Sequence, residues 1–186
     1  MTFPRYSYGA IALHWTIAVL LISQIAVGLW MTKLPKEAAA LKLQVFQLHK
    51  SVGITILLLT LIRILWRLTH RPPALPDAMA GWEKVIARAT HFLFYALLIT
   101  IPMLGWAIVS SSTRHVPTVL YWEIPWPNLP LPSSRELSHN FGEAHEYAAF
   151  AAIALIVLHV GAALKHYLVN RDGVLSRMAP FIQPRS

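Results

Sequence analysis

The sequence predicts an all-α integral membrane protein, a bundle of four transmembrane helices in a single membrane domain over residues 1–186. Three observations predict it. Of the 186 residues, 56% are hydrophobic and 13% are charged, whereas soluble domains average about 25% charged residues. Four apolar stretches are each long enough to cross about 30 Å of hydrocarbon at about 1.5 Å per helical residue. The loops between these stretches are too short to form a separate soluble domain.

The predicted spans cover residues 8–31, 45–66, 86–109 and 144–168. The first resembles a signal peptide in position, but its apolar run is too long and it lacks a small-x-small cleavage site, so we expect it to remain. The segment RLTHRPPALPDAMAGWEK is rich in proline, which ends the second span before the third begins.

The loop at about 111–140 has an unusual composition. Its segment VPTVLYWEIPWPNLPLPSS holds five prolines, two tryptophans and a tyrosine in nineteen residues. Proline disfavours a helix, and aromatic side chains suit the headgroup layer of a membrane. We expect an interfacial cover here, and the alternative is a lid or docking surface at this end of the bundle.

The chain has a net charge of +8. Its Lys and Arg residues are divided unequally between the two sides of the membrane, so we interpret the charge as a signal of membrane orientation and expect no nucleic-acid partner. With four spans, both termini and the loop at 67–85 share one side. Ten Lys and Arg residues belong to that side and six to the other, which predicts cytoplasmic N- and C-termini. The ten are Arg5, Arg63, Arg67, Arg71, Lys84, Arg88, Lys165, Arg171, Arg177 and Arg185.

The chain contains no cysteine. This excludes disulfides, thiolate-held iron–sulfur clusters, covalent c-type haem attachment and cysteine nucleophiles.

Five of the nine histidines lie inside the predicted spans, where ionisable residues are uncommon and usually functional. His14 and His91 fall in the inner, cytoplasmic half of the membrane, and His49 and His145 in the outer half. His159 follows His145 by fourteen residues, roughly 21 Å along a helix, and returns to the inner half. Fourteen steps of about 100° fall about 40° short of four full turns, so His145 and His159 share one helix face.

This pattern favours haem b over zinc. Zinc prefers a tight cluster of four ligands, often with Cys or carboxylates, whereas two imidazoles from facing helices can hold a porphyrin between them. We expect the bundle to enclose two b-type haems. The outer pair is His49 with His145, and the inner site has three candidates, His14, His91 and His159.

A steric argument separates the inner candidates, because a haem against a helix needs a small residue one turn from its ligand. Ala18, Gly53, Ala149 and Ala163 stand four residues after His14, His49, His145 and His159, respectively. Tyr95 stands four residues after His91. The sequence therefore predicts His14 and His159 as the inner ligands and His91 as a residue that does not bind iron.

The motifs ALHW, QLHKSVG and EAHEYAAF…VLHVGAALKH together resemble the prokaryotic cytochrome b561 family over nearly the whole chain. That family is related to the haem-bearing membrane subunits of formate dehydrogenases and nickel–iron hydrogenases. The resemblance implies a multi-pass protein of the bacterial inner membrane with two haem b groups, which exchanges electrons with quinone. It also implies that His14, His49, His145 and His159 are the axial ligands.

Two functions follow from this resemblance. The first is a superoxide:ubiquinone oxidoreductase that oxidises superoxide on the periplasmic side and reduces ubiquinone in the membrane. Lys33, Lys36, Lys42 and Lys50 near His49 would attract the anion. The alternative is a haem b anchor that links a partner redox subunit, a dehydrogenase or hydrogenase, to the quinone pool. A histidine-lined transporter is disfavoured by the histidine spacing.

The quinone pocket is expected on the inner side, where the first, third and fourth spans converge. His91 and His166 are the candidates for a hydrogen bond to a quinone carbonyl.

Overall fold

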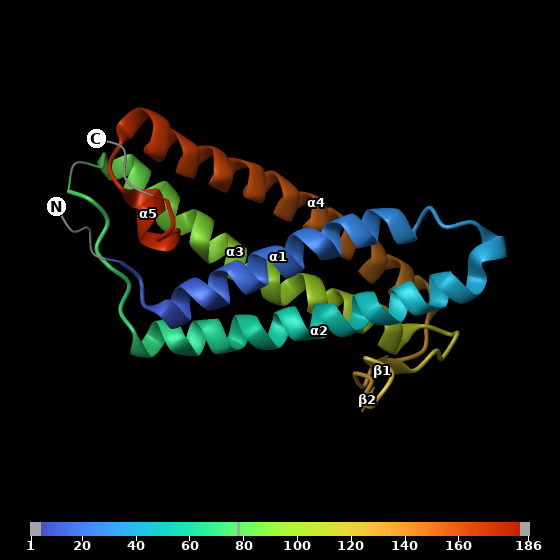
Figure 1. Cartoon of the computed structure of the whole chain (residues 1–186). Coiled ribbons are helices and arrows are strands. Elements are labelled where there is room, and N and C mark those ends of the chain that lie inside the picture. The colour runs from blue at the N-terminus through green and yellow to red at the C-terminus, as the bar shows by residue number, and fades with distance from the viewer. Residues whose placement is uncertain (1–4, 78, 183–186) are drawn as a thin grey trace.

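The computed structural model describes residues 5–77 and 79–182 and consists mainly of four long helices that lie side by side (Figure 1). In this part of the chain, four helical segments are long and apolar enough to cross a membrane. This confirms the predicted fold class. The long helices are α1 (Tyr8–Met31), α2 (Ala39–Thr69), α3 (Gly81–Ser111) and α4 (Arg135–Lys165).

Short elements complete the chain. The 3-10 turn η1 precedes α2, a two-stranded hairpin joins α3 to α4, and a π-helical turn and a short helix follow α4. Their bounds are η1 (Lys36–Ala38), β1 (Thr118–Leu120), β2 (Ile124–Trp126), η2 (His166–Asn170) and α5 (Val174–Met178).

The helices α2, α3 and α4 begin five to nine residues before the predicted spans. The second predicted span starts at residue 45 but α2 starts at Ala39, and the fourth starts at 144 but α4 starts at Arg135. Ser134 caps α4, because its Oγ accepts a hydrogen bond from Leu137 N at 3.2 Å. Hydropathy marks only the apolar part of a helix, so residues 135–140, expected in the outer loop, form the polar first turns of α4.

The middle of the bundle is apolar. Ile17 of α1, Ile56 of α2 and Leu98 of α3 form a buried cluster there, each less than 10% exposed. The closest helix pairs are α3 with α4, α1 with α2, and α2 with α3. Both termini of the described chain lie at one end of the bundle (Figure 1). We call this the inner end, after the predicted orientation, and the opposite end the outer end.

Gly9 of α1 lies directly under the indole of Trp66 on α2. A Cβ atom at Gly9 would lie 2.8 Å from Trp66 Cε2. The indole has little freedom to move, because its Nε1 donates to Ser7 Oγ at 3.0 Å and its ring stacks on His70 at 4.1 Å. The contact between α1 and α2 at the inner end therefore requires glycine at position 9.

We expect Gly9→Ala to lower the free energy of unfolding by about 1–3 kcal/mol, the usual cost of overpacking a close contact. Thermal unfolding of the detergent-solubilised protein measures this. Gly161→Ala is the matched control, since a Cβ there meets nothing within 4 Å. Equal melting temperatures for the two variants would contradict the tight contact.

The outer loop forms a small antiparallel hairpin in which Leu120 pairs with Ile124. Hydrogen bonds tie this loop to α2 and α3: Tyr121 N donates to Ser51 Oγ at 2.9 Å, and Trp106 Nε1 donates to Pro127 O at 2.8 Å. Tyr121 and Trp122 have positive φ angles of 51° and 64°, which bulky residues rarely adopt. The anchoring hydrogen bonds hold this turn and fix the hairpin on the side of the bundle.

The C-terminal segment folds back over the inner end. Arg177 is buried and its Nη1 donates to Ala74 O at 2.5 Å, while Tyr6 N donates to Arg177 O at 3.3 Å. Trp15 Nε1 of α1 donates to Met178 O at 2.9 Å. These bonds join the N-terminal segment, the α2–α3 connection and α5. Arg185, one of the predicted inner cations, lies outside the described residues.

Candidate functional site

Four histidines meet as two pairs at opposite ends of the bundle. His49 of α2 faces His145 of α4, and their ring centroids are 6.3 Å apart. His14 of α1 faces His159 of α4 at 6.4 Å. Since α4 provides one member of each pair, its fourteen-residue spacing sets one histidine at each end, as the sequence predicts.

The separation of each pair fits two imidazoles that bind one metal ion from opposite sides. A metal–imidazole bond is about 2 Å and a ring nitrogen lies about 1.1 Å from its centroid, which gives a centroid separation of about 6.2 Å. The interplanar angles are 68° for the outer pair and 66° for the inner pair. Two imidazoles on opposite sides of one metal ion can each rotate about the line through the metal, so these interplanar angles are compatible with a shared metal ion.

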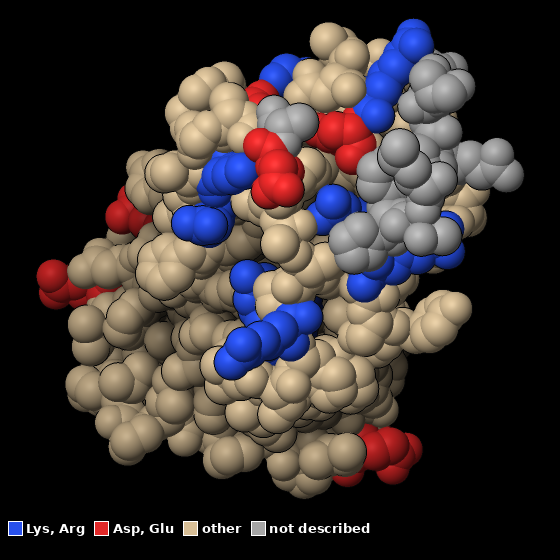
Figure 2. Space-filling view, turned by 90° about the vertical axis from the view of Figure 1, so that its left-hand side faces the viewer, with Lys and Arg blue, Asp and Glu red and all other residues tan. Residues whose placement is uncertain are grey.

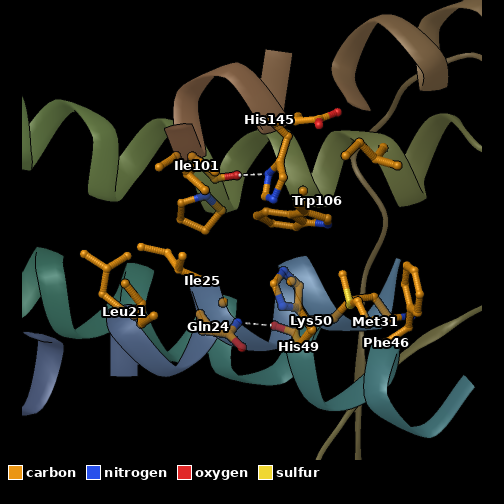
Figure 3. A pocket seen from close by; sticks show the side chains of 18 of the residues that line it. Leu21, Gln24, Ile25, Met31, Phe46, His49, Lys50, Ile101, Trp106 and His145 are labelled. Atoms are coloured by element: carbon orange, nitrogen blue, oxygen red, sulfur yellow. Dashed lines mark hydrogen bonds between the residues drawn. The ribbon is translucent and has the colours of Figure 1, made fainter. Parts of the chain in front are cut away.

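The outer pair borders a cavity of about 470 Å³, within the range of about 300–1,000 Å³ typical of cofactor pockets. Figure 3 shows His49 and His145 directed toward each other across it. Its walls are mainly apolar, and each long helix contributes one glycine: Gly28, Gly53, Gly105 and Gly142.

Two of these glycines provide room for the histidine rings. A Cβ at Gly28 would lie 3.4 Å from His49 Cε1, and one at Gly105 would lie 3.4 Å from His145 Cε1. Ala149, one turn after His145, also lines the cavity. The small residues leave a wide apolar slot beside two facing imidazoles, which fits a flat macrocycle.

Hydrogen bonds orient the outer pair (Figure 3). His145 Nδ1 lies 2.9 Å from Ile101 O on α3. Because a carbonyl only accepts, this bond keeps the proton on Nδ1 and leaves Nε2 with a lone pair for a metal. The buried Gln24 of α1 donates its Nε2–H to His49 O at 2.7 Å and so fixes the backbone at the other ligand. Sequence reasoning missed Gln24 and Gly28; their only signals are a lone amide and a small residue in an apolar helix.

Three histidines gather at the inner pair. His91 of α3 lies 5.6 Å from His159 between ring centroids, closer than the His14–His159 pair. This distance is shorter than the separation of about 6.2 Å expected for two imidazoles that bind one metal ion from opposite sides. His91 Nδ1 donates to Ala87 O, one turn earlier in its own helix, at 2.6 Å.

An arginine accompanies the inner histidines. Arg63 Nη2 of α2 lies 3.2 Å from His14 Nδ1, and its guanidinium also lies over the ring of Tyr95 at 5.7 Å. A guanidinium only donates, so His14 Nδ1 accepts in this arrangement. Sequence spacing could not reveal this pairing of Arg63 with His14.

His166 has partners within its own segment. His166 as a whole is 8% exposed, and its Nδ1 lies 2.5 Å from Asp172 Oδ2 and 3.1 Å from Asn170 Nδ2. The other histidines lie away from the two pairs. His70 stacks on Trp66, His139 lies 3.8 Å from Glu143, and His115 is in the outer loop with a φ of 46°.

Of the four lysines predicted to attract an anion, Lys50 alone lines the outer cavity. Its Nζ donates to Pro117 O at 3.3 Å. Lys42 Nζ donates to Leu34 O at 3.4 Å, and Lys33 and Lys36 are exposed to solvent. Positive charge therefore reaches the outer histidine pair through Lys50.

Among residues 5–77 and 79–182, no three His, Cys, Asp or Glu side chains gather where they could hold a metal ion directly. The facing pairs His49–His145 and His14–His159 each offer two ligands, which suits a metal whose other ligands come from a macrocycle. A membrane-spanning helical bundle with facing histidines beside a large apolar cavity defines a membrane-bound b-type cytochrome.

The chain belongs to the prokaryotic cytochrome b561 family, whose model matches residues 5–181. It is 29% identical to "Cytochrome b561 homolog 2" of Escherichia coli, over 94% of this chain and 90% of that protein. It is 27% identical to "Cytochrome b561 homolog 1" of the same organism, over 95% and 97% of the two chains. It is 28% identical to the "Probable superoxide oxidase CybB" of Yersinia pestis, over 95% and 96%.

Membership of this family makes the chain a multi-pass protein of the bacterial inner membrane that binds haem b and transfers electrons. The sequence-based identification of the family, the fold class and the membrane location is thereby confirmed.

Proposed function

We propose that this protein holds two haem b groups, one between His49 and His145 and one between His14 and His159, and conducts electrons across the membrane. The observation that carries the proposal is the matching separation of the two pairs, 6.3 and 6.4 Å. The pairs are roughly 21 Å apart along α4. Bound haem b supplies an iron that takes up and releases one electron at a time.

In this proposal, the residues around each pair orient its histidines. Ile101 O holds the ring of His145, and Gln24 holds the backbone of His49. At the inner pair, coordination through His14 Nε2 requires a proton on Nδ1. Arg63 Nη2 and His14 Nδ1 would then both be donors, so the hydrogen bond between them would be lost. The Arg63 guanidinium would be free to pair with an anionic group nearby.

We propose superoxide as the electron donor at the outer end. Two superoxide anions each lose one electron and leave as dioxygen. Lys50 provides a cation at the outer cavity, where a local positive potential raises the encounter rate of a small anion. The relative from Yersinia pestis, named a probable superoxide oxidase, supports the same choice.

We propose ubiquinone as the acceptor at the inner end, where it takes up two electrons and two protons to form the quinol. His91 is the first candidate to contact it. The His91 proton is on Nδ1, which donates to Ala87 O, so Nε2 can accept a hydrogen bond from quinol or, once protonated, donate one to a quinone carbonyl. His166 is the second candidate, and its bond to Asp172 would orient it.

The alternative is a haem b anchor subunit for a dehydrogenase or hydrogenase. The observation that favours it is the turn of the outer hairpin, where Tyr121, Trp122 and Ile124 are exposed. Exposed aromatic residues at a rigid turn can form the centre of a protein interface.

We expect Lys50→Gln to slow the reduction of the protein by superoxide by about two- to tenfold at low ionic strength, since it removes a cation that lines the outer cavity. The difference from wild type should shrink as salt is added, because salt screens the attraction. Stopped-flow absorbance of the haem bands measures both. Lys33→Gln is the matched control, and an equal loss there would contradict a local role for Lys50.

The experiment that decides between the two functions uses the purified protein, superoxide generated enzymatically and added ubiquinone. The proposed function predicts that superoxide reduces the haem bands and that ubiquinone reoxidises them. Haem bands that superoxide leaves oxidised would reject this function and favour the anchor subunit.

A further inference from the structure

A second cavity, of about 460 Å³, lies at the inner end, and none of the paired histidines lines it. It is formed by the segment that precedes α1 and the segment that follows α2. Its lining residues are Arg5, Tyr6, Ser7, Tyr8, Ala10, His70, Arg71 and Pro72.

Trp66 holds the two walls of this cavity together. Its indole packs on Gly9, its Nε1 donates to Ser7 Oγ at 3.0 Å, and its ring stacks on His70 at 4.1 Å with an interplanar angle of 4°. The contacts join the start of α1 to the end of α2 on both sides of the indole. The packing of α1 against α2 therefore fixes the two walls of the cavity.

The cavity carries positive charge without a counterion. Of the residues that the structure describes, Arg5 and Arg71 line it and no carboxylate does. Within the described residues, neither guanidinium forms an ion pair. Ser7 Oγ accepts from Trp66 Nε1 and from Ala10 N, so its own hydroxyl proton remains available to a ligand. Two guanidinium groups and a free hydroxyl are donors suited to phosphate.

The surrounding end of the molecule has the same sign of charge. Ten Lys and Arg residues but only three Asp and Glu residues belong to this side of the chain, and Figure 2 shows Lys and Arg side chains gathered on this end. Two of its carboxylates have partners of their own, since Glu83 pairs with Lys165 and Asp172 with His166. They are therefore not free to neutralise the cavity.

The cavity also lies at the depth of the lipid headgroups. Tyr8 is the first residue of the first membrane-spanning helix, and His70 directly follows Thr69, the last residue of the second. Tyr8, Leu68 and Leu65, which are on the adjoining turns of α1 and α2, are 87%, 75% and 62% exposed. A ligand held here has its charged group at the cavity and apolar surface of the helices next to it.

We propose that this cavity binds the phosphate group of an anionic phospholipid, with the acyl chains along the exposed faces of α1 and α2. Basic pockets at the ends of membrane helices are suited to such headgroups. The lipid phosphate bridges Arg5 and Arg71 and thereby links the N-terminal segment to the α2–α3 connection. The proposal is independent of the electron donor and acceptor.

Native mass spectrometry of the haem-loaded protein with added lipid tests this. We expect wild type to retain phosphatidylglycerol in preference to phosphatidylcholine, and R5Q/R71Q to bind phosphatidylglycerol at least about tenfold more weakly. Arg88→Gln is the control, since Arg88 is exposed at the same end and does not line the cavity. Its binding should equal that of wild type.

Four outcomes would overturn the proposal. Equal binding of phosphatidylglycerol by wild type and R5Q/R71Q would show that the two arginines do not contact the lipid. Equal binding of phosphatidylglycerol and phosphatidylcholine would show that the site does not select anionic lipids. Inorganic phosphate that binds wild type while phosphatidylglycerol does not would replace the lipid with a soluble ligand. The haem content of R5Q/R71Q should match wild type, and a loss of haem would assign the arginines to the haem carboxylates instead.

Discussion

Replacing His49 or His145 with alanine should reduce the haem content from about two groups per chain to about one. Each replacement removes one of two imidazoles that face each other at 6.3 Å, while the inner pair keeps both of its own. The pyridine haemochrome assay, combined with a protein determination, gives the ratio. Redox titration of each variant should show the loss of one of two components.

A second variant tests the same site with both ligands intact. Gly105→Leu places a branched side chain in the outer cavity against the ring of His145, where even a Cβ would be at 3.4 Å. It should also lose the outer haem. Gly161→Leu is its control, because nothing lies within 4 Å of a Cβ there. Retention of both haems by His145→Ala would reject the outer assignment.

At the inner end, His14→Ala and His159→Ala should each lose the other haem, whereas His91→Ala should keep both. The reason is geometric, since His14 and His159 have the separation of a shared metal ion and His91 is too close to His159. Haem content again provides the measurement. His91→Ala should instead slow the reoxidation of the protein by ubiquinone.

The outcome for His91 separates the two inner assignments. If His91→Ala lost one haem and His14→Ala lost none, His91 and His159 would be the ligands and the small-residue argument from Ala18 would be wrong. Loss of one haem in all three variants would show that haem binding at the inner site requires His14, His91 and His159 together. It would also contradict a specific role for His91 in quinone binding.

Much of the fold could be predicted because it depends on local properties of the sequence. Hydropathy and length gave the four membrane helices, and the helical period placed His145 and His159 on one face of α4. The depth of each histidine followed from the direction in which its helix crosses the membrane. These arguments need no knowledge of which helices touch, and they identified the outer pair His49–His145. The inner pair His14–His159 needed one further argument, the small residue four positions after each ligand, and both pairs face each other in the structure.

The features that depend on tertiary contact could not be predicted. The roles of Gln24 and Gly28 arise because α1 packs against α2 beside His49. The approach of Arg63 to His14 likewise depends on the rotation of α2 against α1. The proline content of the outer loop excluded a long helix, but the strand pairing depends on distant anchors such as Ser51. The spacing of residues along the sequence does not predict such contacts between helices.

The central claim is that each histidine pair holds one haem, and the most direct test is the haem content and spin state of the wild-type protein. Two facing histidine pairs predict about two haem b groups per chain, both low-spin, because each iron would have two imidazole ligands. Electron paramagnetic resonance of the oxidised protein, with the haemochrome assay, measures both quantities. One haem per chain, or a high-spin haem with an open axial position, would contradict the account.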